Sequence, residues 1–204
     1  MTEKPPYNPS TEGAQMRFDG RMSYSDYLGL DMVLEAQKPR TDTHDEMLFI
    51  IQHQTSELWM RLVLHEMATA RRSIADGQLQ PAFKMLSRVA KIFEQLNNAW
   101  DVLRTMTPSE YTAFRDDLGQ SSGFQSWQYR LIEFTLGNRN HAMIQPHAHR
   151  PDIMAKLEAE LAQPSLYDVA IDALRTAGLL DVPAFQTRDV TQAHIFDAGV
   201  MLAW

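Results

Sequence analysis

Apolar residues along this chain recur with the helical period almost throughout, and strand alternation is hard to find. The longest helical stretch runs from about residue 45 to residue 75 and ends at Gly77. Long helices with an apolar face need a second layer to cover that face. The sequence therefore predicts one all-α domain with long core helices over 21–204. Residues 1–20 are polar and Pro-rich, and we expect them to form a mobile arm.

Capping residues and prolines divide the rest of the chain into further helices. Thr107 with Glu110, and Ser122 with Gln125, have the spacing of capping boxes. Pro81 fits the first turn of a helix, because the N–H groups of the first helical residues have no hydrogen-bond partner within the helix. Helices are predicted over 23–37, 81–104, 107–119, 122–137 and 164–178, with a loop over 138–151.

Charge and cysteine content exclude several classes of function. The net charge is −7 and the positive residues are scattered, which argues against a nucleic-acid partner. The chain of 204 residues has no cysteine, so disulfides, thiolate metal sites and a cysteine nucleophile are excluded. The first residues are polar and no apolar run approaches the length of a membrane span. We expect a cytoplasmic protein without a membrane partner.

His53 is an awkward residue within the apolar helical stretch HDEMLFIIQHQTSELW (44–59). It shares a helical face with Phe49 and Glu57, each one turn away. It could be a buried histidine bonded to a carbonyl or to Glu57, a metal ligand together with Glu57, or a residue that meets a substrate. Di-iron bundles use Glu-x-x-His motifs, and this chain has none. The loop His147–His149 lacks a third ligand, so we expect it to be solvated, and we predict no metal-ligating residue.

Two further features carry chemistry in the stretch 107–134. Tyr111 and Arg115 lie one helical turn apart, and a guanidinium beside an aromatic ring suits a small organic or amino acid. Equally, Arg115 could be an exposed residue that packs its stem on Tyr111. The turn Ser121–Gly123 offers hydroxyls and free N–H groups at a helix start, which can bind an anion such as a propionate or can simply cap the helix.

With these features taken together, the chain resembles the tryptophan 2,3-dioxygenase family. Members of that family are haem enzymes that open the indole ring of L-tryptophan with O2. The shorter stretches PSLYD (164–168) and RDVTQAH (188–194) agree with it, so the similarity runs over nearly the whole chain from Arg21. Most of the resemblance lies in RMSYSDYLGLDMVLEAQ (21–37), HDEMLFIIQHQTSELWMRLVLHE (44–66) and the gap-free pattern over 106–138.

The resemblance implies roles residue by residue. His53 is implied to be the candidate catalytic residue, a distal-pocket histidine that hydrogen-bonds the indole N–H and acts as a positioning group first and a base second. Phe49 is implied to be the aromatic wall and Arg115 the clamp on the substrate carboxylate. The implied substrate residues are Phe49, Ile50, Ile51, Gln52, His53, Tyr111, Arg115, Tyr24, Tyr27 and Leu28, and the implied cofactor residues are Ser122 and Gly123.

The same resemblance implies the cofactor, the product and the assembly. The cofactor is haem b, the substrates are L-tryptophan and O2, and the product is N-formylkynurenine, the first step of tryptophan catabolism by the kynurenine route. The assembly is a homotetramer built as a dimer of dimers. Tyr24, Tyr27 and Leu28 would reach from the first helix into the pocket of a neighbouring subunit.

The last residues, AGVMLAW (198–204), are apolar and lack a C-cap, which leads us to expect a fragment. The resemblance puts the proximal haem histidine, and a Gly- and Thr-rich loop over the substrate, beyond Trp204. None of the seven histidines matches the proximal position. We therefore expect that a chain ending at Trp204 holds no stoichiometric haem and does not oxidise tryptophan. The alternative function is a non-catalytic helical oligomer.

Overall fold

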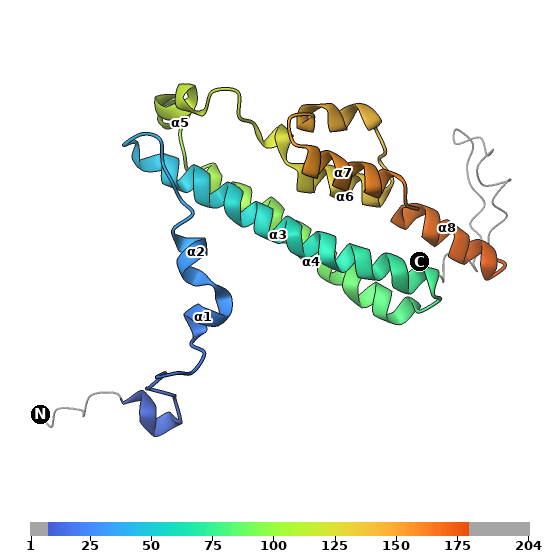
Figure 1. Cartoon of the computed structure of the whole chain (residues 1–204), viewed down its shortest axis with the longest axis horizontal. Coiled ribbons are helices and arrows are strands. Elements are labelled where there is room, and N and C mark those ends of the chain that lie inside the picture. Colours follow the sequence, from blue (N-terminus) through green and yellow to red (C-terminus); the bar gives the residue numbers. More distant parts are fainter. Residues whose placement is uncertain (1–7, 180–204) are drawn as a thin grey trace, which may run out of the picture. The chain divides into compact units, whose positions relative to one another are not determined.

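The computed structural model describes residues 8–179, and every regular element in that range is a helix (Figure 1). This confirms the predicted all-α class. The described residues divide into two units at the junction of Pro39 and Arg40. A domain division after residue 20 stays a prediction. The segments RDVTQAH and AGVMLAW lie outside the described residues, and so does His194.

The first unit contains η1 (Pro9–Glu12), α1 (Tyr24–Leu28) and α2 (Leu30–Leu34). The prediction of one helix over 23–37 is wrong, because Gly29 interrupts the helix and separates α1 from α2. Gly29 has φ of 61°, a left-handed conformation that glycine adopts at little cost, and its N–H donates to the carbonyls that end α1. Neither α1 nor α2 has a buried residue, and most of their apolar side chains are exposed, including Tyr24, Tyr27 and Met32.

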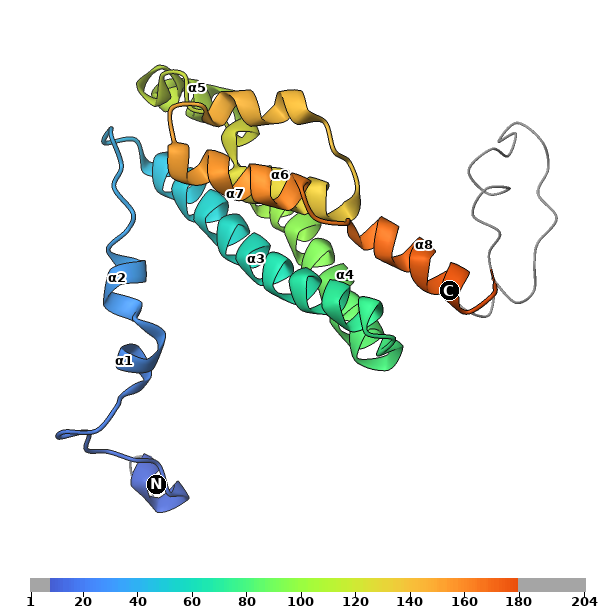
Figure 2. The same cartoon turned by 45° about the vertical axis from the view of Figure 1, so that its right-hand side comes forward.

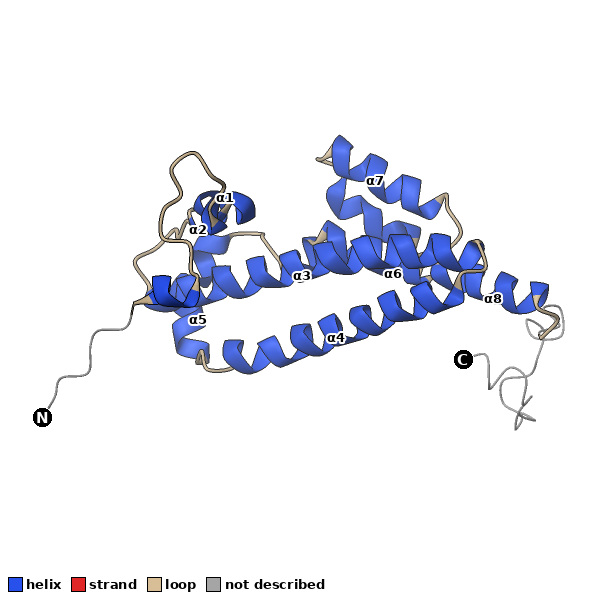
Figure 3. Cartoon of the chain, turned by 90° about the horizontal axis from the view of Figure 1, so that it is seen from below, coloured by secondary structure: helices blue, strands red, loops and turns tan. Residues whose placement is uncertain are grey.

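The second unit is built on α3 (His44–Ala75) and α4 (Leu79–Leu103), which lie side by side along most of their length (Figures 1 and 3). Gly77, at φ of 73°, lies in the short turn between them. Buried residues on α3 recur every three or four positions, as the apolar stripe of a helix requires. That stripe packs against buried residues of α4 in one cluster, which includes Met60, Val63, Met67, Ala70, Ile74, Ala82, Val89 and Ile92.

The shorter helices follow in chain order: α5 (Pro108–Arg115), η2 (Asp116–Leu118), η3 (Gly123–Gln125), α6 (Trp127–Leu136), η4 (His141–His147), α7 (Pro151–Leu161) and α8 (Leu166–Thr176). Helices α5, α6 and α8 pack on α3, and α7 packs on α6 (Figure 2). None of the helices in residues 8–179 is both long and apolar enough to cross a membrane.

Three boundaries differ from the predictions. The capping box of Ser122 and Gln125 closes only a 3₁₀ turn, and α6 begins later, at Trp127, where Ser126 caps it. The end of the helix predicted over 107–119 is the 3₁₀ turn η2. The predicted loop 138–151 contains η4, and α7 was not predicted, although Pro151 at its first position is a typical helix start.

The expected solvated loop at His147 is also wrong, because the His147 side chain is buried with 3% of its surface exposed. It ends η4, which packs with α6 and α7 around a second apolar cluster of Phe134, Ile144 and Leu157. Burial, and then the positive charge of His149, lowers the pKa of His147. The packing of η4 with α6 and α7 therefore favours the neutral form of the His147 ring.

A buried carboxylate fixes the start of α3. Glu46 is only 1% exposed and accepts hydrogen bonds from the N–H groups of Arg40 and Thr41, each at 2.8 Å, and from the Thr41 hydroxyl at 2.6 Å. These bonds, that of the Thr41 hydroxyl first, hold the pKa of Glu46 below its usual value. They tie the incoming chain to the first turn of α3, one turn before Phe49.

Candidate functional site

An aromatic cluster joins α5 to the first half of α3. The Phe49 ring on α3 lies 5.8 Å from Tyr111 and 5.6 Å from Phe114, and the last two rings meet edge-on at 5.5 Å. Phe114 is fully buried and anchors the cluster, whereas Phe49 and Tyr111 keep part of their surface open. Edge-on and tilted contacts at these separations are favourable for aromatic pairs. Two of the predicted substrate residues, Phe49 and Tyr111, are thus brought together although they are far apart in the sequence.

The His53 ring stacks beside Phe49 with 4.1 Å between ring centroids, and its Nδ1 lies 2.8 Å from the Phe49 carbonyl oxygen. A carbonyl oxygen only accepts, so Nδ1 must carry the proton of this hydrogen bond. In the neutral ring Nε2 is then the unprotonated nitrogen and can accept a hydrogen bond. One of the alternatives left open by the sequence, a histidine bonded to a carbonyl, is therefore correct for Nδ1. The same bond leaves Nε2 able to accept a hydrogen bond from a ligand.

A pocket of about 120 Å³ lies beside His53 between α3, α4 and the start of α6. Its walls combine apolar and aromatic side chains with a few polar groups, a lining that suits a small molecule, and its volume is below the range of about 300–1,000 Å³ that is usual for ligand sites. A second pocket of about 370 Å³ begins at Phe49 and Tyr111, and Leu103 borders both. The lining of the first pocket is Gln52, His53, Ser56, Glu57, Met60, Trp100, Leu103, Gly123, Ser126 and Tyr129.

Gln128 joins the two walls of the His53 pocket. Its side-chain Nε2 donates to the Glu57 carbonyl oxygen at 2.8 Å and to the Glu57 carboxylate at 2.7 Å. Gln128 is 6% exposed, so these bonds form in a largely dry environment. Glu57 is therefore bonded to α6, not to His53, and the turn of α3 that follows His53 is fixed against the turn that carries Ser126 and Tyr129.

Comparison with known proteins bears directly on this site. A family model described as tryptophan 2,3-dioxygenase matches residues 9–187. Tryptophan 2,3-dioxygenase from Bradyrhizobium diazoefficiens is 63% identical over 198 residues, which is 97% of this chain and 71% of that protein. The enzyme of the same name from Bradyrhizobium sp. strain BTAi1 is 68% identical over 98% of this chain and 71% of its own length. That from Ruegeria pomeroyi is 60% identical, with 97% and 71% covered.

This chain belongs to the tryptophan 2,3-dioxygenase family. It is accordingly an oxidoreductase with a tryptophan dioxygenase function. Every element that lines the two pockets lies inside the matched range 9–187. The resemblance identified from the sequence is confirmed.

The remaining predicted residues of this dioxygenase lie in varied surroundings. Arg115 is half-buried at the end of α5, and its Nη1 donates to the Gly119 carbonyl oxygen at 3.0 Å. Gly123 lines the His53 pocket, while the Ser122 hydroxyl accepts from the Phe124 N–H as a cap. Gln52 lines the same pocket; Ile50 and Ile51 line neither of the two pockets.

The first-helix residues belong to the other unit. Tyr24, Tyr27 and Leu28 are 74%, 76% and 42% exposed, respectively, on α1. The contacts that their family role requires lie with another subunit, so that role stays a prediction.

Several residues of the pocket were not predicted from the sequence. Trp100 and Tyr129 face the His53 pocket and keep 54% and 45% of their surface exposed, respectively. An aromatic residue on a helix is normally assigned to the core. Only the fold shows that the side chains of these two residues are about half exposed. The sequence also gives no indication that Gln128 supports this site, because its hydrogen-bond partner Glu57 is 71 residues away.

We predict that Gln128→Leu lowers the free energy of unfolding by about 1–3 kcal/mol, because it leaves the Glu57 carboxylate without its buried donor. Urea unfolding followed by far-UV circular dichroism measures this loss. Gln120→Leu, at an exposed glutamine, is the matched control and should change little. Equal stability of the two variants would show that the Glu57 bonds do not hold α6 on α3.

Proposed function

We propose that the described residues form the tryptophan-binding side of an enzyme that inserts O2 across the indole C2–C3 bond of L-tryptophan to give N-formylkynurenine, with haem b as its cofactor. The observation that carries the proposal is the state of His53. Its Nδ1 is hydrogen-bonded to the Phe49 carbonyl, which leaves Nε2 as the acceptor of a ring that lines a pocket with Trp100 and Tyr129. An indole ring has one N–H donor and a flat apolar body, which match these two features.

The indole would be held by stacking and by one hydrogen bond. Phe49 and Tyr111 offer aromatic surface, and such contacts add to the gain from burying the ring. The Nε2 of His53 would accept the indole N–H. His53 thereby orients the C2–C3 bond. It need not remove the indole proton, because oxygen can attack that bond while the N–H stays intact.

The amino-acid part of tryptophan carries a carboxylate, for which we propose Arg115 as the partner. One guanidinium nitrogen of Arg115 is bonded to Gly119, which orients the group and leaves its other N–H donors for a ligand. Tyr111 lies one turn earlier on the same helix and could add its hydroxyl. Charge-assisted bonds of this kind are about twice as strong as neutral ones.

The described residues around His53 fit one face of a haem. Trp100, Phe124 and Tyr129 are 54%, 54% and 45% exposed, respectively, and a flat apolar macrocycle would cover such surfaces. The backbone at Gly123 borders open space, so a macrocycle could approach it closely. We propose Ser122 and Gly123 as cofactor contacts. When bound, the haem iron would supply the activation of O2, and the protein would supply orientation and the exclusion of water.

Our first kinetic prediction concerns the carboxylate. Arg115→Ala should raise KM for L-tryptophan and lower kcat/KM by about 1.5–3 kcal/mol, because a charged hydrogen bond is lost. Steady-state kinetics of haem-loaded protein measure this, with haem content unchanged. Arg104→Ala, at an exposed arginine paired with Asp101, serves as the control. A KM near that of the control would exclude Arg115 as the clamp.

The second kinetic prediction separates positioning from base catalysis at His53. His53→Ala should reduce turnover of L-tryptophan less than the roughly 100- to 10,000-fold expected for loss of a required base. The same variant should still turn over 1-methyltryptophan, which has no indole N–H to remove. His141→Ala, at an exposed histidine, is the control. Loss of both activities with substrate binding intact would contradict the positioning role.

We also propose that the protein assembles as a homotetramer, a dimer of dimers in which the first unit reaches a neighbouring subunit. The support lies in the composition of that unit. Its exposed apolar side chains include Met22, Tyr24, Tyr27, Met32 and Leu34, each more than two-thirds exposed. Apolar surface of this extent is typical of a segment that is buried by a partner.

We predict that deleting residues 1–30 weakens both oligomerisation and tryptophan binding. The reason is that Tyr24, Tyr27 and Leu28 would be lost from the interface and from the neighbouring pocket together. Light scattering gives the mass, and calorimetric titration gives the affinity for L-tryptophan. Deleting residues 1–12 alone is the control, because it spares α1. A protein lacking 1–30 that kept its mass and its affinity would refute the shared pocket.

A further inference from the structure

A groove away from the His53 pocket lies where α3 and α7 flank α6. Its floor is a stripe of α6 formed by Trp127, Leu131 and Thr135, spaced four residues apart so that they share one face. Arg61, Leu64, His65 and Ala68 of α3 form one wall, and Lys156 and Glu160 of α7 form the other. The groove has a volume of about 370 Å³ and shares no lining residue with the pocket beside His53.

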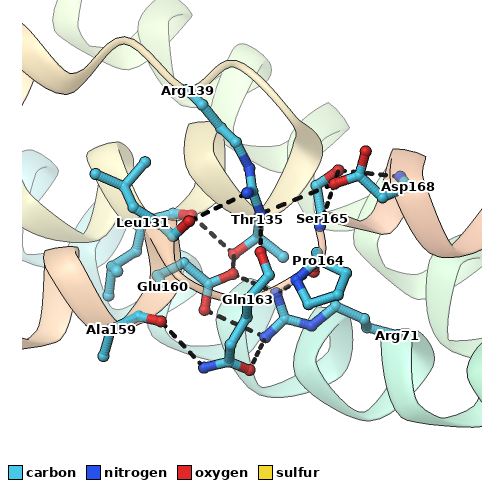
Figure 4. A network of polar contacts seen from close by, with 11 residues as sticks. Arg71, Leu131, Thr135, Arg139, Ala159, Glu160, Gln163, Pro164, Ser165 and Asp168 are labelled. Carbon is cyan, nitrogen blue, oxygen red and sulfur yellow. Dashed lines mark hydrogen bonds and ion pairs between the residues drawn. The ribbon is translucent and has the colours of Figure 1, made fainter.

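One end of the groove is closed by an ion pair that spans α3 and α7 (Figure 4). Arg71 Nη1 lies 2.5 Å from the Glu160 carboxylate, and both side chains are nearly buried, at 13% and 14% exposed. The Thr135 hydroxyl donates to the same carboxylate at 2.7 Å. Arg71 also donates to the Pro164 carbonyl and to the Gln163 side chain. Arg71 and Glu160 thus satisfy each other at this end.

The other end of the groove is positively charged. Arg61 and Lys156 are exposed, and within residues 8–179 neither forms an ion pair with a carboxylate. The Lys156 ammonium lies 4.9 Å from the centre of the Trp127 ring, over the groove floor. In a chain with a net charge of −7, two unpaired cations around an apolar floor form a local site for an anion.

We propose that this groove binds a small carboxylate that has a flat apolar body. The apolar body would lie on Trp127 and Leu131, and the carboxylate would lie between Arg61 and Lys156. The volume is within the range of small-molecule sites. A helix or strand of another protein would have to continue past the end that Arg71 and Glu160 close, so a compact ligand fits better. The site does not depend on the haem or on the reaction proposed above.

Phenylacetate is a suitable probe, because it combines one carboxylate with one flat ring. Titration of the full chain, followed by the indole N–H signals in proton–nitrogen NMR spectra, should shift the signal of Trp127, assigned through Trp127→Phe. The neutral isostere phenylacetamide should shift it far less. Arg61→Gln and Lys156→Gln should each weaken phenylacetate binding by about two- to fivefold, the range for an exposed charged contact.

Controls decide between this ligand and other occupants. Lys84→Gln, at an exposed lysine of α4 outside the groove, should leave the affinity unchanged. The proposal fails if phenylacetamide binds as well as phenylacetate, or if the groove variants bind no worse than Lys84→Gln. It also fails if inorganic phosphate displaces phenylacetate at equal concentration, since the apolar floor would then add nothing. Loss of self-association in Arg61→Glu/Lys156→Glu, with no phenylacetate binding in the parent chain, would identify an interface between copies instead.

Discussion

The buried stripe of α3 is the constraint on which the rest of the second unit depends. Helix α3 has 32 residues, about 48 Å of helix, and α4, α5, α6 and α8 all pack on it. Because one rigid element carries all of these contacts, residues far apart in the sequence acquire fixed positions relative to His53. Tyr111 reaches Phe49 through the packing of α5, and Tyr129 reaches the His53 pocket through the packing of α6.

Apolar burial alone would let these helices slide, since it has little directionality. Polar contacts at carboxylates set the register. Glu46 ties the incoming chain to the first turn of α3, Glu57 ties α3 to Gln128 of α6, and Glu66 ties α3 to Arg88 of α4 at 2.5 Å. Each is directional, and an unpaired member in a dry environment would be costly. Glu57, the second of these carboxylates, itself lines the pocket beside His53.

Neighbouring residues at the start of α6 contribute to the groove between α3 and α7 and to the His53 pocket. Trp127 forms the floor of the groove between α3 and α7, and Gln128 holds Glu57 at the His53 pocket. The first turn of α6 is therefore a shared wall, fixed by the Ser126 cap on one side and by buried hydrogen bonds on the other. The proposed carboxylate site and the proposed tryptophan site are thus separate in their linings but adjacent along one helix.

The sequence by itself determined the helical class, most helix starts and the family. Helical periodicity and capping boxes are local, so Thr107 with Glu110 acts where its spacing indicates, and the helix predicted over 164–178 is present as α8. Local rules failed where two signals competed: Gly29 broke a predicted helix, and Ser126, not Ser122, caps α6. Only the tertiary structure decided that Glu57 pairs with Gln128 and that His147 is buried. These depend on contacts between segments distant in the chain, and neither periodicity nor spacing encodes such contacts.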